Sequence, residues 1–352
     1  MHATTVGVDL AKNRFELAVA DEQFRVARRE RLTRARFSQF FGNHPPCLIV
    51  MEACGSAHYW ARTFQAQGHE VRLLPAQYVR AYVRRNKTDA ADAAALIEAS
   101  RCTEIRPVPI KSIDQQVLQQ LHRVREQWKH TRTARINQLR GCLREFGIVI
   151  PVGAQRGIVA VRESLECADN ALPDALRPFV LELLQEIAEL EQRLKGVERM
   201  LTQLTRKDQA VRELLKIPGI GLLSATALRA ALSDVQRFPS GRHLASWLGV
   251  TARERSSGER RRLGAISKCG DVHLRTLLIH GARSVLLAAK QAVKAGRSLD
   301  RLRAWALETE QRRGHNKATV ALANKMARIV WATWKYQRSF DGNWISQPSP
   351  QR

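Results

Sequence analysis

The stretch TTVGVDLAKNRFELAVA, residues 4–20, decides the fold class of the N-terminal region. Apolar side chains alternate with small or polar ones up to residue 10 and again from residue 15, on either side of a polar turn. Alternation with a period of two is typical of strands with one buried face, so the stretch predicts a β-hairpin. Asp9 lies on the first of these strands, where it is either an edge or turn residue or part of a site.

Strands and helices alternate after the hairpin. We expect a third strand at residues 23–29, a helix at 33–42, a strand at 47–51 that ends in Glu52, a helix to residue 68 and a strand at 70–74. The continuous Leu-Ile-Val-Met run suits a strand covered on both faces, and the alternation implies an α/β sheet with parallel members. A sheet that pairs the first and fourth strands would bring Asp9 and Glu52 together.

A basic cluster and two carboxylates stand side by side in RRNKTDAADAAAL, residues 84–96. The spacing of Asp89 and Asp92 puts both on one helix face, about 5–6 Å apart at Cβ. On one interpretation Thr88 caps the helix and the two acids complement its macrodipole. On the other interpretation, the two aspartates form one metal site with Asp9 and Glu52 of the sheet. A divalent metal with oxygen ligands needs several acidic oxygens, and phosphoryl chemistry with two metal ions requires such a site.

The chain is strongly basic, and its length of 352 residues allows two or three domains. It carries 58 Lys and Arg against 33 Asp and Glu, a net charge of +25, and residues 251–352 are the most basic part, with 21 against 7. A globular protein this basic usually meets a polyanion, and nucleic acid presents charge over such an extent. A membrane-surface role would need an amphipathic anchor, which the sequence lacks.

Targeting and cysteine motifs are missing from the sequence. The N-terminus has an acid at position 9 and lacks the apolar core of a signal peptide, and no stretch approaches the ~18–20 apolar residues of a membrane span. We therefore expect a cytoplasmic protein with no membrane contact. The six cysteines form no CxxC pair and no cluster with zinc spacing, so we expect neither disulfides nor structural zinc.

The middle region predicts two long helices. Residues 113–146 form a basic helix with an apolar stripe at Val117, Leu121, Val124 and Trp128. The second helix has apolar residues that alternate threes and fours, which is typical of a coiled-coil seam. These residues are Val180, Leu183, Ile187, Leu190, Leu194, Val197, Leu201 and Leu204. Both helices could be ordinary amphipathic helices on a core, but the unbroken register favours a helical hairpin that reaches a partner subunit.

The third region opens with LLKIPGIGLLSATALRAAL, residues 214–232. Pro218, Gly219 and Gly221 break one helix and start another. The Gly-Ile-Gly turn offers backbone N–H groups at a helix N-terminus, where a phosphate could bind. The pattern resembles a helix-hairpin-helix, which grips a nucleic-acid backbone without reading its sequence, although a plain turn fits these residues as well.

A basic loop with two adjacent serines follows. Ser256 and Ser257 precede Gly258, and the loop is dense in basic residues, namely Arg253, Arg255, Arg260, Arg261, Arg262 and Lys268. A serine hydroxyl is a poor nucleophile unless positive charge stabilises its alkoxide or the phosphate that it attacks. Arginines around a flexible serine could supply that charge. The alternative is a solvated basic loop that only binds phosphate.

Five motifs in order resemble the signatures of one family. VGVDLAKNRFELAVA, MEACGSAHYWA, NKTDAADAAAL, IPGIG and SSGERRRLGAISKCGDVHLR are similar to those of DEDD transposases of the Piv/MooV class, which are insertion-sequence recombinases. The resemblance covers roughly residues 4–335. It implies an α/β plus α protein: a RuvC-like (ribonuclease-H-like) mixed-sheet domain at 1–110, a helical coiled-coil region at 111–208, a mostly helical transposase domain with the serine loop at 209–340, and a tail at 341–352.

The resemblance also implies roles for individual residues. The acidic tetrad would be Asp9, Glu52, Asp89 and Asp92, which would bind Mg²⁺, with Mn²⁺ able to substitute. Arg84, Arg85 and Lys87 would lie where the phosphate backbone passes. The family's nucleophilic serine stands just before a glycine in the basic loop, which matches Ser257. Ser256 stays the alternative, and Ser267 is a weaker one.

Partners follow from the same resemblance. Members of the class work with a structured non-coding RNA, a guide or bridge RNA that pairs with donor and target DNA, so base pairing would choose the sequence. The seam of the second long helix, rather than the resemblance, leads us to expect a homo-oligomer, a dimer or tetramer. The alternative function is a RuvC-like structure-specific endonuclease with water as nucleophile, and a third class is a non-catalytic scaffold. A recombinase would leave a covalent 5′-phosphoserine and rejoined strands, a nuclease free ends, and a scaffold neither.

Overall fold

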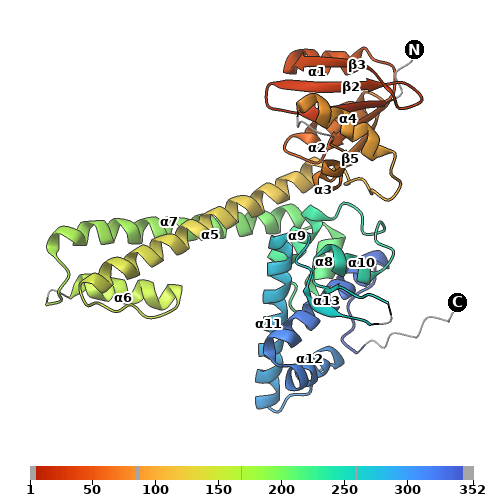
Figure 1. Ribbon diagram of the computed structural model, residues 1–352. Coiled ribbons are helices and arrows are strands. Elements are labelled where there is room, and N and C mark those ends of the chain that lie inside the picture. Colours follow the sequence, from red (N-terminus) through yellow and green to blue (C-terminus); the bar gives the residue numbers. More distant parts are fainter. Residues whose placement is uncertain (1–4, 84–87, 168, 259, 344–352) are drawn as a thin grey trace. The chain divides into compact units, whose positions relative to one another are not determined.

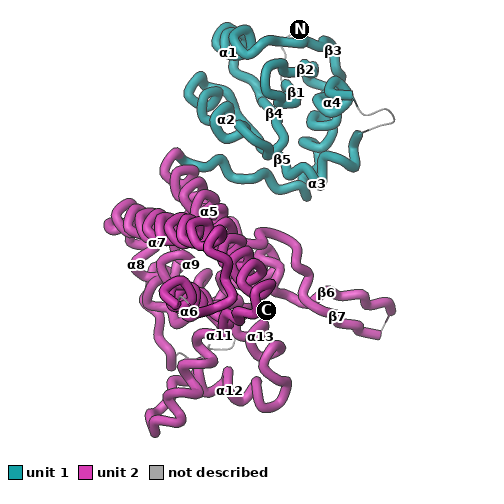
Figure 2. Tube along the Cα trace, turned by 90° about the vertical axis from the view of Figure 1, so that its left-hand side faces the viewer, with its two compact units in different colours: residues 1–112 teal, residues 113–352 magenta. Residues whose placement is uncertain are grey.

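The computed structural model describes residues 5–83, 88–167, 169–258 and 260–343. The chain forms two compact units, Met1–Ser112 and Ile113–Arg352, which Figure 2 shows in different colours. The first unit is built on a sheet, and the second is mostly helical (Figure 1). The fold class expected from the sequence, a mixed α/β sheet domain followed by a mostly helical region, is therefore confirmed.

Unit 1 contains a five-stranded mixed sheet. Its strands are β1 (Thr5–Leu10), β2 (Arg14–Ala20), β3 (Val26–Thr33), β4 (Leu48–Glu52) and β5 (Glu70–Leu74). The strand order is β3-β2-β1-β4-β5. The β1–β2 and β2–β3 pairs are antiparallel, whereas β1–β4 and β4–β5 are parallel. The hairpin of residues 4–20 and the pairing of the first and fourth strands are both as predicted.

Helices cover both faces of this sheet. They are α1 (Arg34–Gly42), α2 (Ala57–Ala66), α3 (Ala76–Val79), the 3-10 turn η1 (Arg80–Tyr82) and α4 (Asp89–Ser100). On one face, buried aromatic residues of the sheet, α1 and α2 form a core in which the rings of Phe15 and Phe37 stack with centroids 4.2 Å apart. On the other face, Ala93 and Ile97 of α4 pack against Ala18 and Ala20 of β2. The central strands are thus buried on both sides, whereas the edge strand β3 is mostly exposed.

The third strand begins three residues later than the sequence predicts. Residues 23–25 belong to a turn instead, because the Asp21 carboxylate accepts hydrogen bonds from the backbone N–H groups of Gln23 and Arg25 at 3.0 and 2.9 Å. Phe24 takes a positive φ of 60° in this turn. The strand runs from Val26 to Thr33, so the expected range 23–29 was wrong at both ends.

Unit 2 begins with long helices and ends in a helical core. The first helices are α5 (Ile113–Glu145), α6 (Ala154–Glu166), η2 (Asp174–Leu176) and α7 (Arg177–Thr205), and Figure 1 shows α5 and α7 side by side. The core contains α8 (Gln209–Leu215), α9 (Leu222–Ala231), α10 (Gly241–Trp247), α11 (Val272–Lys294), α12 (Arg301–Arg313) and α13 (His315–Lys335), and a hairpin of β6 (Ala252–Glu254) and β7 (Leu263–Ile266). No helix among the described residues is long and apolar enough to cross a membrane.

The seam of α7 is covered by α5 of the same chain, so the predicted helical hairpin is present, and its contact with a partner subunit stays a prediction. Apolar residues of α5 and α7 share two buried clusters, and the ion pairs Arg125–Glu198 and Arg135–Glu186 join the two helices at 2.7 and 2.6 Å. The buried α7 residues are Val180, Leu184, Ile187, Leu190, Leu194, Val197, Leu201 and Thr205. An apolar stripe predicts that a face is buried but does not say by what. The homo-oligomer stays a prediction.

Two seam positions were wrong, and so were two of the four positions in the apolar stripe of α5, whereas Leu121 and Trp128 pack against a buried cluster as predicted. Leu183 is only partly buried and Leu204 is 50% exposed. The buried residues of α7 lie instead at positions 180 and 184 near its start and at 201 and 205 near its end. A spacing of four residues keeps both members of each pair on one face of a helix with 3.6 residues per turn. On α5, Val117 and Val124 are 40% and 39% exposed. The buried face carries Gln115, Leu118 and His122 instead. The side chains of Gln115 and His122 can be buried because they form hydrogen bonds with α9 and with Ser233, which follows it. An apolar pattern cannot reveal a polar buried face.

Candidate active site

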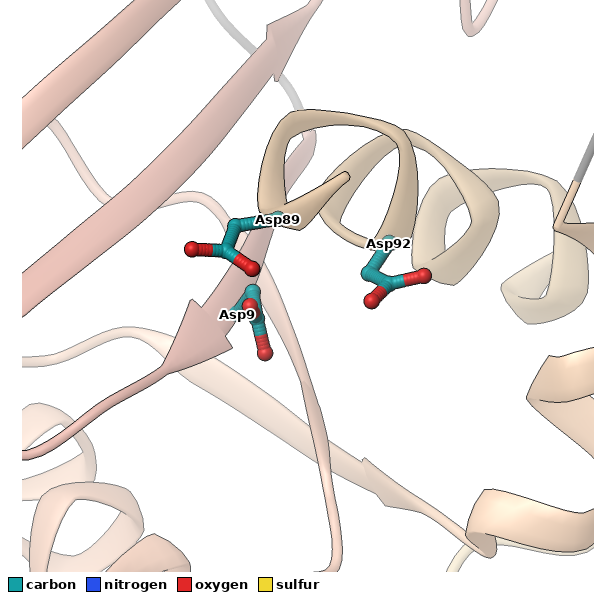
Figure 3. A group of neighbouring side chains, drawn as sticks. All are labelled: Asp9, Asp89 and Asp92. Atoms are coloured by element: carbon teal, nitrogen blue, oxygen red, sulfur yellow. The ribbon is translucent and has the colours of Figure 1, made fainter. Parts of the chain in front are cut away.

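Three carboxylates meet where β1 ends and α4 begins (Figure 3). The ligand oxygens of Asp9, Asp89 and Asp92 all lie within 4.8 Å of one another. Thr88 caps α4, since its hydroxyl accepts a hydrogen bond from the Ala91 N–H at 3.2 Å, and this cap places both helical acids in the first turn. The capping role predicted for Thr88 is therefore confirmed, and the two acids it orients point toward the strand.

Glycine at position 7 lets the helix come this close to the strand. A Cβ on Gly7 would lie 2.2 Å from the carbonyl oxygen of Ala93 in α4 and 3.0 Å from Cγ1 of Ile97. Residues two apart on a strand share a face, so Gly7 and Asp9 both face α4. The sequence interpretation missed Gly7. The signal was a lone glycine inside a strand pattern, which often marks a close backbone approach.

The cluster is electrostatically strained. Burial, and then the charges of Asp89, Asp92, Glu52 and Glu16, raise the pKa of Asp9 to about 6. One carboxylate oxygen of Asp92, Oδ1, is buried without a hydrogen-bond partner among the described residues. A buried acceptor without a partner and three crowded carboxylates are both relieved by a bound cation. The residues present thus fit a divalent metal ion with oxygen ligands.

Glu52 lies near the cluster but outside it. It ends β4, and the register pairs Met51 with Val8, one residue before each of the two sheet acids. Its charge contributes to the raised pKa of Asp9, yet its oxygens do not belong to the group within 4.8 Å. The structure thus brings together three of the four acids predicted from the sequence and leaves Glu52 farther away.

The two serines lie at the tip of the β6–β7 hairpin, which projects from the helices of its unit (Figure 2). The Arg260 N–H donates to the carbonyl oxygen of Ser257 at 3.2 Å and closes the turn. Gly258 has a φ of +56°, a conformation that favours glycine. Ser256, Ser257 and Gly258 are all exposed. The glycine after the serines is therefore the residue that allows the tip to turn.

The hydroxyl groups of the two serines differ in their hydrogen bonds. The Ser256 hydroxyl donates to Glu254 Oε1 at 2.8 Å and accepts from the Arg262 N–H at 3.1 Å. Hydrogen bonds from Ser256 and Arg261 lower the pKa of Glu254, which makes it a weak base for that hydroxyl. Within the described part of the hairpin, the Ser257 hydroxyl makes no hydrogen bond to the protein. Ser256 is therefore held in place by the hairpin, whereas the Ser257 hydroxyl is exposed and has no hydrogen-bond partner among the described residues.

The basic residues around the serines are exposed. Arg261 pairs with Glu254 at 3.1 Å, and Arg253 donates to the carbonyl oxygen of Ser267 at 2.9 Å. Arg255, Arg260, Arg262 and Lys268 are exposed as well. The Ser267 hydroxyl accepts from the Cys269 N–H at 3.4 Å, away from the tip. The other predicted backbone contacts, Arg84, Arg85 and Lys87, lie outside the described residues.

The Gly-Ile-Gly turn joins α8 to α9, and its two glycines have different surroundings. Gly219 has a φ of +81°, and a Cβ there would lie 2.7 Å from the carbonyl oxygen of Gly281 in α11. This glycine therefore serves the packing of the turn against α11. Gly221 is the exposed N-cap residue of α9, with open space around it. Phosphate binding at the turn stays a prediction, and it concerns Gly221 more than Gly219.

Comparison with known proteins places the chain in a family. The family model described as "Transposase IS116/IS110/IS902 family" matches residues 211–296, and a DEDD model described as "Transposase" matches residues 6–148. "Probable family 20 transposase" of Pseudomonas aeruginosa is 43% identical over 94% of this chain and 97% of its own length.

Two further relatives are transposases of named insertion sequences. "Transposase for insertion sequence element IS1111A" of Coxiella burnetii is 35% identical over 95% of this chain and 90% of its own length. "Transposase for insertion sequence element IS1328" of Yersinia enterocolitica is 34% identical over 94% of this chain and 96% of its own length. The chain therefore belongs to the IS116/IS110/IS902 family of insertion-sequence transposases, enzymes that bind and recombine DNA.

Proposed function

We propose that this transposase is an RNA-guided recombinase of the Piv/MooV class, which cuts and rejoins DNA strands through an acidic metal site and a nucleophilic serine. The observation that carries the proposal is the group of Asp9, Asp89 and Asp92, whose ligand oxygens lie within 4.8 Å of one another. Acids so far apart in the sequence converge at a strand end and a helix start. The sheet order β3-β2-β1-β4-β5 supports a ribonuclease-H-like, and specifically RuvC-like, assignment.

The metal proposed for this site is Mg²⁺, with Mn²⁺ able to substitute. Hard cations prefer carboxylate oxygens, and Mg²⁺ commonly binds through one or two carboxylates together with phosphate oxygens of the substrate. When bound, it would stabilise the charge that develops on the phosphate. Asp9, Asp89 and Asp92 would hold it, and the unpartnered Oδ1 of Asp92 would gain a ligand. Glu52, at the end of β4 and near enough for its charge to raise the pKa of Asp9, would complete the tetrad.

Ser257 is the nucleophile in this proposal. Its hydroxyl is exposed and has no hydrogen bond to the described protein residues, whereas that of Ser256 has two. Attack by the Ser257 oxygen on a phosphodiester would form a phosphoserine ester and release a DNA hydroxyl. The bond energy is then conserved, so rejoining needs no external cofactor. The exposed arginines of the hairpin would stabilise the charged phosphate during the exchange.

A structured guide RNA is the proposed source of sequence choice. The net charge of +25 supports a protein that binds RNA and two DNA duplexes at once, since each phosphate contact adds to affinity without reading sequence. The residues assigned to backbone contact are those of the hairpin, the exposed Gly221 turn and the basic cluster of residues 84–87. Base pairing would then choose the site, as in other RNA-guided systems.

The test is to trap the covalent intermediate. The full-length protein is incubated with its element's flanking RNA, Mg²⁺ and a DNA substrate nicked next to the cleavage position, so that the released strand diffuses away. We expect a protein–DNA adduct that peptide mass spectrometry maps to Ser257. Free 5′-phosphate ends without an adduct would replace the recombinase with a RuvC-like nuclease that uses water. Omitting the RNA should abolish site choice, and equal site choice without it would refute the guide.

A further inference from the structure

The hairpin that carries the serines leaves the helical core through two neighbouring segments (Figure 2). These segments are residues 248–251 before β6 and 267–270 after β7, and we call them the root of the hairpin. They are in close contact, because a Cβ on Gly249 would lie 2.0 Å from the carbonyl oxygen of Cys269. Gly249 also has a φ of +72°, a conformation that favours glycine. The two sides of the root therefore pack backbone against backbone.

Backbone hydrogen bonds join the two sides of the hairpin from its root toward its tip. In the root, the Ser267 N–H donates to the carbonyl oxygen of Thr251 at 2.8 Å. Close to the tip, the Arg255 N–H donates to the carbonyl oxygen of Arg262 at 2.9 Å. The hairpin is therefore an arm whose direction is set where it leaves the core.

Ser257 lies at the far end of this arm, as the seventh residue after Val250 of the root. At a rise of about 3.3 Å per residue the arm is about 20 Å long, so a rotation of about 5° at the root would move the serine by about 2 Å. A misplacement of only about 1 Å can slow an enzymatic reaction about 100-fold. A nucleophile on such an arm therefore needs a root that is held in one orientation.

One side chain of α11 contacts both sides of the root. Arg275 is only 8% exposed, and arginine is rarely buried to this extent. Its Nη1 donates to the carbonyl oxygen of Leu248 at 3.4 Å and to that of Cys269 at 3.3 Å. A single nitrogen thus bridges the two sides of the root. This nitrogen would lie 3.0 Å from a Cβ on Gly249, so the glycine also leaves room for the guanidinium.

The surroundings of Arg275 fix its own position. Asp271 caps α11, since its carboxylate accepts from the Leu274 N–H at 2.9 Å, and Leu274 is buried in the core of unit 2. From α13, the Asn324 side-chain amide donates to the carbonyl oxygen of Val250 at 3.1 Å. This second contact reaches only one side of the root, so it cannot replace the bridge that Arg275 makes.

We propose that Arg275 is the positioning residue of the serine hairpin: it fixes the direction of the arm and thereby the place of the Ser257 oxygen. The inference rests on the proposed role of Ser257 as the nucleophile. Because Arg275 is buried, it acts through the two carbonyl groups of the root and does not itself contact the DNA. The exposed arginines of the hairpin bind phosphate, whereas this buried arginine orients the arm that carries them.

The test compares two substitutions of Arg275 in the full-length protein. Arg275→Met keeps an unbranched apolar stem and removes the donors, whereas Arg275→Lys keeps one charged nitrogen with N–H donors for both carbonyls. Arg283→Met, at an exposed position of the same helix, is the matched control. Hydrogen exchange of peptides that contain the N–H groups of Ser267 and Lys268 reports on the root. The rate of adduct formation at Ser257 is measured with saturating RNA and DNA, together with the half-saturating DNA concentration.

We expect the root N–H groups of Arg275→Met to exchange at least about tenfold faster, because two charged hydrogen bonds are lost. Its adduct should form about 10–100-fold more slowly at an unchanged half-saturating DNA concentration, since the arm is misdirected and the phosphate-binding arginines remain. Arg275→Lys should recover most of both losses, and Arg283→Met should match the unaltered chain in both rates. Thermal midpoints check folding, and Arg275→Gln takes the place of Arg275→Met if the latter does not fold.

Adduct formation by Arg275→Met at the unaltered rate would overturn the proposal, and so would root exchange that the substitution leaves unchanged. Equal losses in Arg275→Met and Arg275→Lys would overturn it as well, because the bridging nitrogen would then not be what matters. An unaltered chain that forms no adduct would instead refute the serine mechanism. The exchange of the root N–H groups would in that case still decide whether Arg275 holds the arm.

Discussion

Gly7 of β1 and Ala93 of α4 are in such close contact that a Cβ on the glycine would lie 2.2 Å from the alanine's carbonyl oxygen. Because Asp89 and Asp92 are in the first turn of this helix, the contact sets their distance from Asp9. The geometry of the acidic site therefore depends on a residue that carries no functional group. Packing between helix and strand, and not the acids themselves, holds the carboxylates together.

Gly7→Ala should push α4 away from β1. Inserting a methyl group into a filled contact costs about 1–3 kcal/mol of unfolding free energy, which denaturant titration of the full-length protein measures. The stabilisation by Mg²⁺ should also weaken, since the three carboxylates separate. Gly55→Ala is the control, because no atom lies within 4 Å of a Cβ at that position. Equal Mg²⁺ responses in the two variants would show that Gly7 does not set the site.

Asp9→Asn should make stability in chelator less sensitive to pH. The pKa of Asp9 is raised to about 6, so the folded protein holds that proton more tightly than the unfolded chain does. The stabilising contribution is present below about pH 4 and is lost as the pH rises through 6. At pH 8 the variant should therefore be the more stable chain, by roughly 1–2 kcal/mol once solvent screening of a half-exposed group is allowed for.

Mg²⁺ should reverse that order. Thermal unfolding at pH 8 in excess Mg²⁺ should favour the unaltered chain, because the metal needs the carboxylate that Asn lacks. The comparison at about pH 3, below the ordinary carboxyl pKa of 3.8, where Asp9 is mostly protonated in both the folded and the unfolded chain, is the internal control. A midpoint for Asp9→Asn that rises with Mg²⁺ as much as that of the unaltered chain would contradict a metal site at Asp9.

Ser257→Ala should abolish strand cleavage and exchange while binding of RNA and DNA survives. The substitution removes the attacking oxygen and leaves the arginines of the hairpin in place. Cleavage assays on labelled DNA and gel-shift titrations measure the two properties separately. Ser256→Ala loses the hydrogen bonds to Glu254 and Arg262 but should keep most activity. If only Ser256→Ala were inactive, the nucleophile would be the neighbouring residue, and normal cleavage by Ser257→Ala would assign the attack to water.

Leu190→Glu with Val197→Glu should unfold the α5–α7 hairpin within a single chain. The two side chains are 4% and 6% exposed and lie on the face of α7 that α5 covers. Burying two unpaired charges should cost more than about 2 kcal/mol each. Circular dichroism should report the loss of helix and light scattering the mass. Leu181→Glu, at a 49% exposed position of α7, is the control. A lower mass with full helicity would return the seam to a partner subunit.

Local pattern predicted part of the secondary structure of this protein, although not the bounds of β3 or the β6–β7 hairpin. The alternation of residues 4–20 gave the hairpin, and the helical periodicity gave α5 and α7 to within a few residues. These predictions succeeded because apolar residues repeat every two residues in a strand with one buried face and every 3.6 residues in a helix with one buried face. Asp9, Asp89 and Asp92 were found for a related reason, since acids in an apolar strand and in a helix's first turn are conspicuous in the sequence.

Contacts between distant residues decided the rest. The close approach at Gly7, the position of Glu52 outside the cluster, the covering of α7 by α5 and the contact of Arg275 with Leu248 each join segments far apart in the chain. Periodicity tells which face of an element is buried, but the partner on that face depends on how the whole chain packs. Polar side chains such as His122 are buried only because a hydroxyl on another helix satisfies them, and no local pattern carries that information.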